Sequence, residues 1–296
     1  MVAARLRGIM YMSTGDFQDL SNLASVILPS SLESYSARTT TNCLSVRFLS
    51  VEPGGAYSSD VGRNLITKDM MIVAGCAESE IPEGILSTAS TYAMSYGNVP
   101  VSLKTPYSMQ RINNYSFCRC DSRPVEAELR GSSALTSTGA GIFDCAYALS
   151  SVVLDAPFKT IAARAFRSCS SLLSIRLPAT LTACAASAFA GCVSMNEIRF
   201  DGLSAPAITN TAFGAAAGNW TGEKQAGLHV NRVYVPEGAV GYENALSNLV
   251  DPTKCDFLFS DRGVDWIYVD GRPGVSNAHY INCRLSGVGD DGNVYT

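Results

Sequence analysis

The feature that most constrains the fold is a motif that occurs twice between residues 161 and 200. Five apolar positions recur 23 residues later: Phe166, Cys169, Leu172, Ile175 and Leu177 return as Phe189, Cys192, Met195, Ile198 and Phe200. A fixed period of roughly 20 to 50 residues is typical of proteins that are built from stacked repeats. In such folds each repeat buries its apolar face against its neighbours, so the stack shares one continuous core.

Each copy of the motif predicts a short strand followed by a tight turn. Ile175 and Leu177 alternate with Arg176, which is the pattern of a strand with one buried face. Pro178 ends this strand because it has no N–H to donate to a neighbouring strand. Apolar residues then recur every three or four positions, which indicates a coil or a short helical turn. The predicted fold class is therefore a β-rich solenoid with about 23 residues in each rung, where a rung is one turn of the solenoid.

The repeated unit resembles the repeat of the BspA-like leucine-rich repeat family. The residues that carry the resemblance are Ala165, Phe166, Cys169, Leu172, Ile175, Leu177, Pro178, Leu181, Ala188, Phe189 and Cys192. A second trait of that family is the run Val233–Gly238, which reads VYVPEG, with Tyr242 six residues after its proline. The resemblance implies leucine-rich repeats and a role in extracellular recognition, namely adhesion to a protein or glycan surface.

We divide the chain into three parts. Residues 1–12 are expected to form a small N-terminal cap, and the repeat register begins with Phe17 inside a leucine-rich-repeat solenoid at 13–256. Residues 257–296 depart from the repeat, contain two strand-like runs and are expected to form a β-rich C-terminal cap or docking segment.

Irregular inserts interrupt the solenoid at two places. Residues 50–70 break the period, and their Pro-Gly-Gly run predicts a loop or protruding hairpin. A later insert before Val233 carries Trp220, which is either an exposed contact residue or part of a loop that folds back on the last rungs.

Composition and charge exclude several classes of partner. The chain is 47% hydrophobic and 16% charged, with a net charge of −4 and no long run of one sign. A nucleic-acid partner would need a basic stripe that neutralises phosphates, and a membrane surface would need a polybasic patch. No run reaches the ~20 apolar residues of a membrane-spanning helix. We therefore expect neither nucleic-acid binding nor membrane insertion.

The ten cysteines indicate buried thiols rather than a metal site. Cys120, Cys169 and Cys192 each follow a phenylalanine by three positions, so they share one place in the repeat. There is no CxxC pair, and the CxC at Cys118 has no second cluster with which to hold zinc. No cofactor or metal is predicted.

We find no pattern that indicates an enzyme. The chain has two histidines, His229 and His279, and neither lies in a nucleophile motif. Phosphate-binding glycine loops and metalloprotease motifs are missing as well. A pair of carboxylates close in space is the alternative that would revive catalysis.

The candidate site is the outer face of the strands. The middle residue of each predicted strand points outward: Ile27, Arg47, Ser102, Glu128, Val153, Arg176, Arg199 and Tyr234. Arg176 and Arg199 lie on adjacent rungs, about 5 Å apart, and with Tyr234 they form an Arg–Tyr patch of the kind enriched in interfaces. The alternative is that these arginines are solvated charges that protect the open sheet. The candidate binding residues are Arg176, Arg199, Tyr234, Glu128, Arg47 and Trp220.

Two biological settings fit a non-enzymatic recognition protein. The start at Met1 without a recognisable secretion signal favours a phage virion surface component, such as a decoration, fibre or tail protein, because virions assemble inside the cell. Its partners would include other virion proteins. The alternative is a bacterial cell-surface BspA-like adhesin that binds a host protein or glycan.

Overall fold

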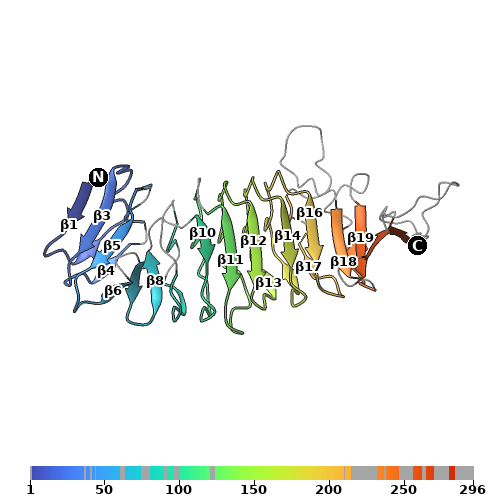
Figure 1. Ribbon diagram of the computed structural model, residues 1–296, viewed down its shortest axis with the longest axis horizontal. Coiled ribbons are helices and arrows are strands. Elements are labelled where there is room, and N and C mark those ends of the chain that lie inside the picture. The colour runs from blue at the N-terminus through green and yellow to red at the C-terminus, as the bar shows by residue number, and fades with distance from the viewer. Residues whose placement is uncertain are drawn as a thin grey trace.

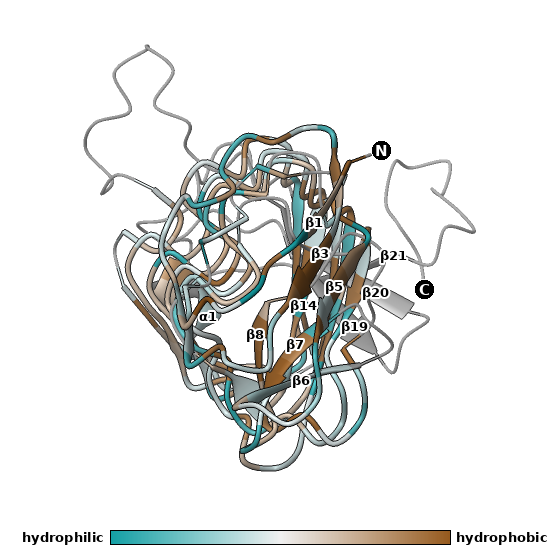
Figure 2. Ribbon diagram, turned by 90° about the vertical axis from the view of Figure 1, so that its left-hand side faces the viewer, coloured by the Kyte–Doolittle hydropathy of each residue, from teal (hydrophilic) through white to brown (hydrophobic). Residues whose placement is uncertain are grey.

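The repeats stack into an elongated solenoid, as Figure 1 shows for this computed structural model. The structure describes residues 2–36, 38–40, 42–43, 45–60, 64–74, 81–89, 92–95, 101–120, 124–209, 211–214, 232–236 and 238–246, and the strands 256–261, 265–269 and 280–283. Along the axis, the chain winds around an apolar interior, with long strands on one side and turns on the other (Figure 2). The predicted β-rich solenoid is confirmed.

The long strands form a row along the solenoid and pair in parallel within three groups, which span residues 2–51, 102–155 and 174–261. They are β1 (Val2–Arg5), β3 (Leu23–Leu28), β5 (Phe48–Val51), β10 (Ser102–Lys104), β11 (Glu126–Arg130), β12 (Ser151–Asp155), β14 (Ser174–Leu177), β16 (Glu197–Phe200), β18 (Arg232–Pro236) and β19 (Asp256–Asp261). Antiparallel strands β20 (Asp265–Val269) and β21 (Tyr280–Cys283) continue the sheet.

Strands of two residues follow the long ones around each rung. They are β2 (Tyr11–Met12), β4 (Ser34–Tyr35), β9 (Ser87–Thr88), β13 (Thr160–Ile161), β15 (Ala183–Cys184) and β17 (Ala207–Ile208), and a short helix, α1, spans Tyr242–Leu246. Residues 1–12 thus contain β1 and β2, which pair with β3 and β4 of the next rung. The domain boundaries at residues 12 and 256 stay predictions.

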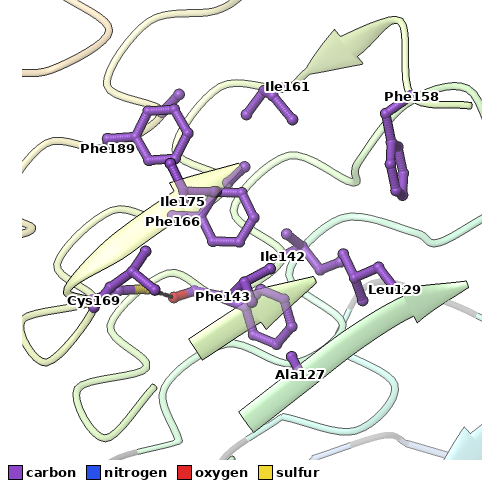
Figure 3. Packing of buried hydrophobic residues seen from close by; sticks show 14 of the residues in the cluster. Ala127, Leu129, Ile142, Phe143, Phe158, Ile161, Phe166, Cys169, Ile175 and Phe189 are labelled. Atoms are coloured by element: carbon purple, nitrogen blue, oxygen red, sulfur yellow. Dashed lines mark hydrogen bonds between the residues drawn. The ribbon is translucent and has the colours of Figure 1, made fainter. Parts of the chain in front are cut away.

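A column of stacked phenylalanine rings runs through the core. Neighbouring ring centroids are 5.4–5.7 Å apart along the series Phe117, Phe143, Phe166, Phe189 and Phe213. Figure 3 shows Phe143, Phe166 and Phe189 one above another. The column repeats because each rung places its phenylalanine at the same point of the turn, where it is buried from solvent. Aromatic rings gain stability from such offset stacking in addition to their burial.

The repeat cysteines are buried thiols, as predicted, and Cys169 and Cys192 also make a hydrogen bond between rungs. The thiol of Cys169 donates to the carbonyl oxygen of Phe143 at 3.2 Å (Figure 3), and that of Cys192 donates to Phe166 at 3.0 Å. Cys43 makes the same bond to Phe17. Cys43 was not predicted as a repeat cysteine because Thr40 replaces the phenylalanine three positions before it.

The turns around Phe17, Phe117, Phe143, Phe166 and Phe189 bend through left-handed backbone positions two residues before and two residues after the phenylalanine. Arg164 (φ 59°) and Ser168 (φ 60°) flank Phe166 in this way, although neither is a glycine. Gly141 occupies the first of these positions in the preceding rung, with φ 58°. A Cβ at Gly141 would overlap the ring of Tyr115, so glycine is needed there for space as well as for backbone conformation.

Two expectations for the N-terminal third need correction. The strand predicted at Val46–Phe48 lies instead at Phe48–Val51, where Leu49 pairs with Val26 and restores the 23-residue spacing. The insert at 50–70 does form an antiparallel hairpin, from β6 (Tyr57–Asp60) to β7 (Asn64–Thr67), which continues into β8 (Met71–Ala74). The hairpin does not protrude, because its second strand is buried in the core: Leu65 belongs to one apolar cluster and Ile66 to the other.

Candidate functional site

The outer face of the long strands carries a column of charged residues in register. Lys104 pairs with Glu128 and Glu128 with Val153, while Arg176 pairs with Arg199 and Arg199 with Tyr234. The alternate residues of these strands, such as Leu103, Ile175 and Ile198, are buried. The predicted positions of Glu128, Arg176 and Arg199 are therefore confirmed. Lys104, and not Ser102, shares their column.

Arg176 is a strongly exposed member of the predicted contact residues. Its side chain is 69% exposed, and its Nε donates to both carboxylate oxygens of Asp201, at 3.0 and 2.8 Å. The hydrogen bond from Arg176 to Asp201 raises the pKa of the arginine above its ordinary value. Exposed ion pairs of this kind contribute at most about 1 kcal/mol. A carboxylate of a partner could therefore compete for the guanidinium.

Tyr234 does not serve as the exposed contact residue that the sequence predicted. Its side chain is buried, with 7% exposure, and the guanidinium carbon of Arg199 lies 5.0 Å from its ring centroid. A cation over an aromatic face is an attractive contact. Tyr234 thus holds Arg199 in place from below, and Arg199 is the member of the pair that reaches the surface.

The remaining predicted residues do not join this patch. Glu128 is engaged by Lys104 at 3.4 Å and by Arg130 at 4.0 Å. Arg47 precedes β5 instead of lying in its middle, and its backbone N–H donates to Ala24 at 2.9 Å, so its predicted place in the column was wrong. Trp220 lies outside the described residues.

Exposed apolar side chains that the sequence did not predict lie on the rung of Arg176 and on the two rungs beside it. Val153 (52% exposed) lies in β12, and Leu173 (56%), Val193 (47%) and Tyr147 (43%) lie in the turns that lead into β14, β16 and β12. These three strands lie side by side in Figure 1. We call the set Tyr147, Val153, Leu173, Arg176, Val193 and Arg199 the Arg176 face.

A signal for these residues was present in the repeat alignment. Ser150 and Asn196 stand 23 residues on either side of Leu173, and Ser170 stands midway between Tyr147 and Val193. Neighbouring rungs thus carry polar residues at the same surface positions. Tyr147, Leu173 and Val193 are therefore apolar at surface positions that are polar in neighbouring rungs, and the packing of the core does not explain them.

A second Arg–Tyr pair, which the sequence did not predict, lies at the other ends of the strands. The guanidinium carbon of Arg130 lies 4.8 Å from the ring centroid of Tyr107, and the Tyr107 hydroxyl donates to Asp155 at 3.4 Å. Unlike Tyr234, Tyr107 is 55% exposed.

An ion pair in the turns joins a buried carboxylate to a partly exposed arginine: the side chain of Asp144 is 7% exposed and that of Arg167 is 35% exposed. Arg167 donates from Nε and one terminal nitrogen to the two carboxylate oxygens of Asp144, at 2.6 and 2.7 Å. This hydrogen bonding raises the pKa of Arg167 above its ordinary value. The two residues are 23 positions apart, so the pair links adjacent rungs in the same way as the phenylalanine stack.

The described part of the chain offers few other chemical sites. Within it, no cluster of three or more His, Cys, Asp and Glu side chains is arranged to bind a metal ion. No helix in these residues combines the length and apolar character needed to cross a membrane.

Comparison with known proteins agrees with the repeat. The model of the BspA type leucine rich repeat region matches residues 88–217 in six copies. No curated protein sequence matches the chain. A solved leucine-rich repeat protein from Eubacterium ventriosum aligns with a TM-score of 0.56 and 15% identity, over 76% of this chain and 68% of that one.

A leucine rich cell surface protein from Faecalibacterium prausnitzii aligns with a TM-score of 0.51 and 17% identity, over 67% of this chain. The aligned part spans 59% of the length of that protein. At these identities the likeness concerns the fold, and it agrees with the match to the repeat model. Residues 88–217 therefore consist of repeats of the BspA-type leucine-rich repeat kind.

Proposed function

We propose that this chain is a bacterial cell-surface recognition protein that binds a protein partner through the Arg176 face. The observation that carries the proposal is that three adjacent rungs expose several large apolar side chains together with the guanidinium of Arg176. Protein interfaces combine an apolar centre with arginine and tyrosine anchors. The stacked rungs hold these side chains on regular strands, so little conformational entropy is lost when a partner binds.

The cell-surface setting takes the place of the virion setting that the sequence analysis favoured. The F. prausnitzii protein with a similar fold is described as a cell surface protein. No finding favours a virion component, so the adhesin alternative becomes the main proposal. The two settings are separated by quantifying this chain in cell envelopes and in released particles by peptide mass spectrometry. Recovery in particles at a fixed ratio to a shell protein would contradict the surface proposal.

The binding surface is tested with two sets of substitutions. Arg176→Ala with Arg199→Ala removes the two cations, and Leu173→Asn with Val193→Ser installs the polar residues that adjacent rungs carry in the same columns. Because all four side chains lie on the surface, we expect both double variants to fold. Each should lower binding of the fluorescently labelled protein to epithelial cells at least tenfold, which corresponds to about 1.4 kcal/mol.

Two controls make the result specific. Arg5→Ala removes an exposed cation from β1, at the N-terminal end of the row of strands and outside the Arg176 face, and it should leave cell binding unchanged. Treating the cells with a protease before the assay should abolish binding, since the proposed partner is a protein. If both double variants bind as well as the original chain while circular dichroism shows that they are folded, the Arg176 face is not the binding surface.

A further inference from the structure

Tyr107 forms a flat aromatic surface at the carboxyl ends of β10, β11 and β12. Its hydroxyl reaches across the rung of Arg130 to Asp155, 48 positions along the chain. The Arg130 guanidinium carbon lies 4.8 Å from the ring centroid and therefore covers one face of the ring. With one face covered, the 55% exposure of Tyr107 comes largely from the opposite face and the ring edge.

Tyr107 is held through its backbone N–H and its hydroxyl, and Arg130 packs against one face of its ring. The backbone N–H of Tyr107 donates to a carboxylate oxygen of Glu83 at 3.2 Å, while its hydroxyl donates to Asp155. Arg130 is itself fixed, because its Nε donates to the carbonyl of Thr105 at 2.9 Å and its own carbonyl accepts from the Thr105 hydroxyl at 2.6 Å. Binding would therefore require little reordering of these side chains.

Comparison with Tyr234 distinguishes a tyrosine that only packs in the sheet from one that can contact a ligand. Both tyrosines lie against an arginine, but Tyr234 is 7% exposed and has no open face to offer. If the only role of such a pair were to stabilise the sheet, burial as at Tyr234 would serve it better, because apolar surface gains stability when it leaves water. Tyr107 instead leaves a rigid aromatic face in solvent.

The surroundings of the ring indicate what kind of ligand fits it. Lys104, whose side chain is 53% exposed, and Glu128, at 29%, are in neighbouring strands beside Arg130 and Asp155. Ammonium and guanidinium groups donate hydrogen bonds, and carboxylates accept them, so a ligand with many hydroxyl groups can satisfy both. Cations and carboxylates are present in equal number among these four residues, so a polyanion would meet as much repulsion as attraction.

We propose that Tyr107, Arg130, Asp155, Lys104 and Glu128, which we call the Tyr107 platform, bind a neutral hexopyranose unit of a glycan. The sugar ring stacks its C–H face on the open face of Tyr107, whose negative quadrupole attracts the partly positive hydrogens. The hydroxyl groups at the rim of the sugar bond to the charged side chains around the platform. This site is separate from the Arg176 face and goes beyond the protein binding proposed there.

The test uses three neutral probes: hexamers of β-1,4-linked glucose, β-1,4-linked galactose and α-1,4-linked glucose. Isothermal titration calorimetry measures the affinity, and saturation-transfer NMR identifies the sugar protons that contact an aromatic ring. We expect at least one hexamer to bind, and Tyr107→Ala to weaken it about tenfold or more, the loss typical of an anchoring aromatic residue. Tyr107→Phe keeps the ring and should lose only about twofold to threefold, because the ring and not the hydroxyl makes the stacking contact.

Tyr11 provides a matched control. It is 62% exposed and its hydroxyl donates to Glu33 of the next rung at 2.9 Å, but it lies on β2, outside the sheet that carries the platform. Tyr11→Ala should therefore leave sugar affinity unchanged. Circular dichroism checks that each variant is folded, which the surface position of both tyrosines favours.

Several outcomes would overturn the assignment. They are no binding of any hexamer, full affinity in Tyr107→Ala, an equal loss in Tyr11→Ala, and binding of heparin alone, which would indicate a polyanion. The double variant Arg176→Ala with Arg199→Ala should keep its affinity for the hexamer. The glycan site and the protein-binding face can therefore fail independently of each other.

Discussion

Replacing Phe166 by leucine should destabilise the solenoid mainly through the loss of stacking. The Phe166 ring is fully buried between Phe143, at 5.7 Å, and Phe189, at 5.4 Å. Leucine retains most of the apolar burial but cannot stack. Each stacked pair contributes about 0.5–1.5 kcal/mol beyond burial, so the loss of two pairs should lower the free energy of unfolding by about 1–3 kcal/mol.

Phe117 is the matched control for this substitution. It is also fully buried, but it stacks on one phenylalanine in the described structure, Phe143, at 5.6 Å. Phe117→Leu should therefore cost about half as much as Phe166→Leu. Phe166→Ala should cost about 3–5 kcal/mol, because it adds a cavity to the lost stacking.

The assay is guanidinium chloride unfolding followed by circular dichroism, with the slope of the transition compared between variants. A repeat protein can unfold in parts, so a changed slope would mean that one region has separated from the rest. In that case hydrogen exchange of the amides around each substituted ring gives the local free energy. The reasoning is refuted if Phe117→Leu costs as much as Phe166→Leu, because the number of stacked rings would then not set the loss.

Three further predictions concern the turns and the thiols. Arg167→Met should lower the free energy of unfolding by about 2 kcal/mol, because it leaves the buried carboxylate of Asp144 without its cation. Asp144→Asn should cost less, because the amide oxygen still accepts a hydrogen bond from Arg167. Chemical denaturation of both variants checks this order. Ser168 and Gly141 both have positive φ, so Ser168→Gly should stabilise the protein by up to about 1 kcal/mol and Gly141→Ala should destabilise it. If both substitutions shifted the melting temperature in the same direction, this reasoning would be wrong. Burial raises the pKa of Cys184 from 9.0 to about 12, so this thiol ionises at a lower pH in the unfolded chain than in the folded one. The free energy of unfolding should therefore fall between pH 9 and 12, by at most about 1.4 kcal/mol per pH unit. Cys184→Ala should remove this contribution to the pH dependence of stability.

The 23-residue period made the fold predictable from local sequence. The positions of Phe166, Cys169 and Ile175 within one rung fix which side chains face inward, and the same positions return in the next rung. Prediction failed where the pattern was interrupted. Thr40 stands where a phenylalanine is expected, so the strand after it was placed at Val46 and not at Phe48, and Arg47 was assigned to the wrong position.

The candidate site was predictable only in part. The pairing of Arg176 with Arg199 followed from the period, since both occupy one column of the sheet. The burial of Tyr234 did not follow, because an outward direction in a strand does not determine what packs over the side chain. The Tyr107 platform was missed because it joins residues from three rungs through side-chain reach, which no repeat position encodes.

The sequence by itself determined that this chain is a solenoid, because contacts between rungs repeat at a fixed separation along the chain and therefore appear as a period. The tertiary structure alone decided which outward side chains remain accessible. Tyr107 and Tyr234 both lie against an arginine, yet one is 55% and the other 7% exposed. Exposure depends on the packing of neighbouring rungs around each ring, and this packing is a property of the assembled stack.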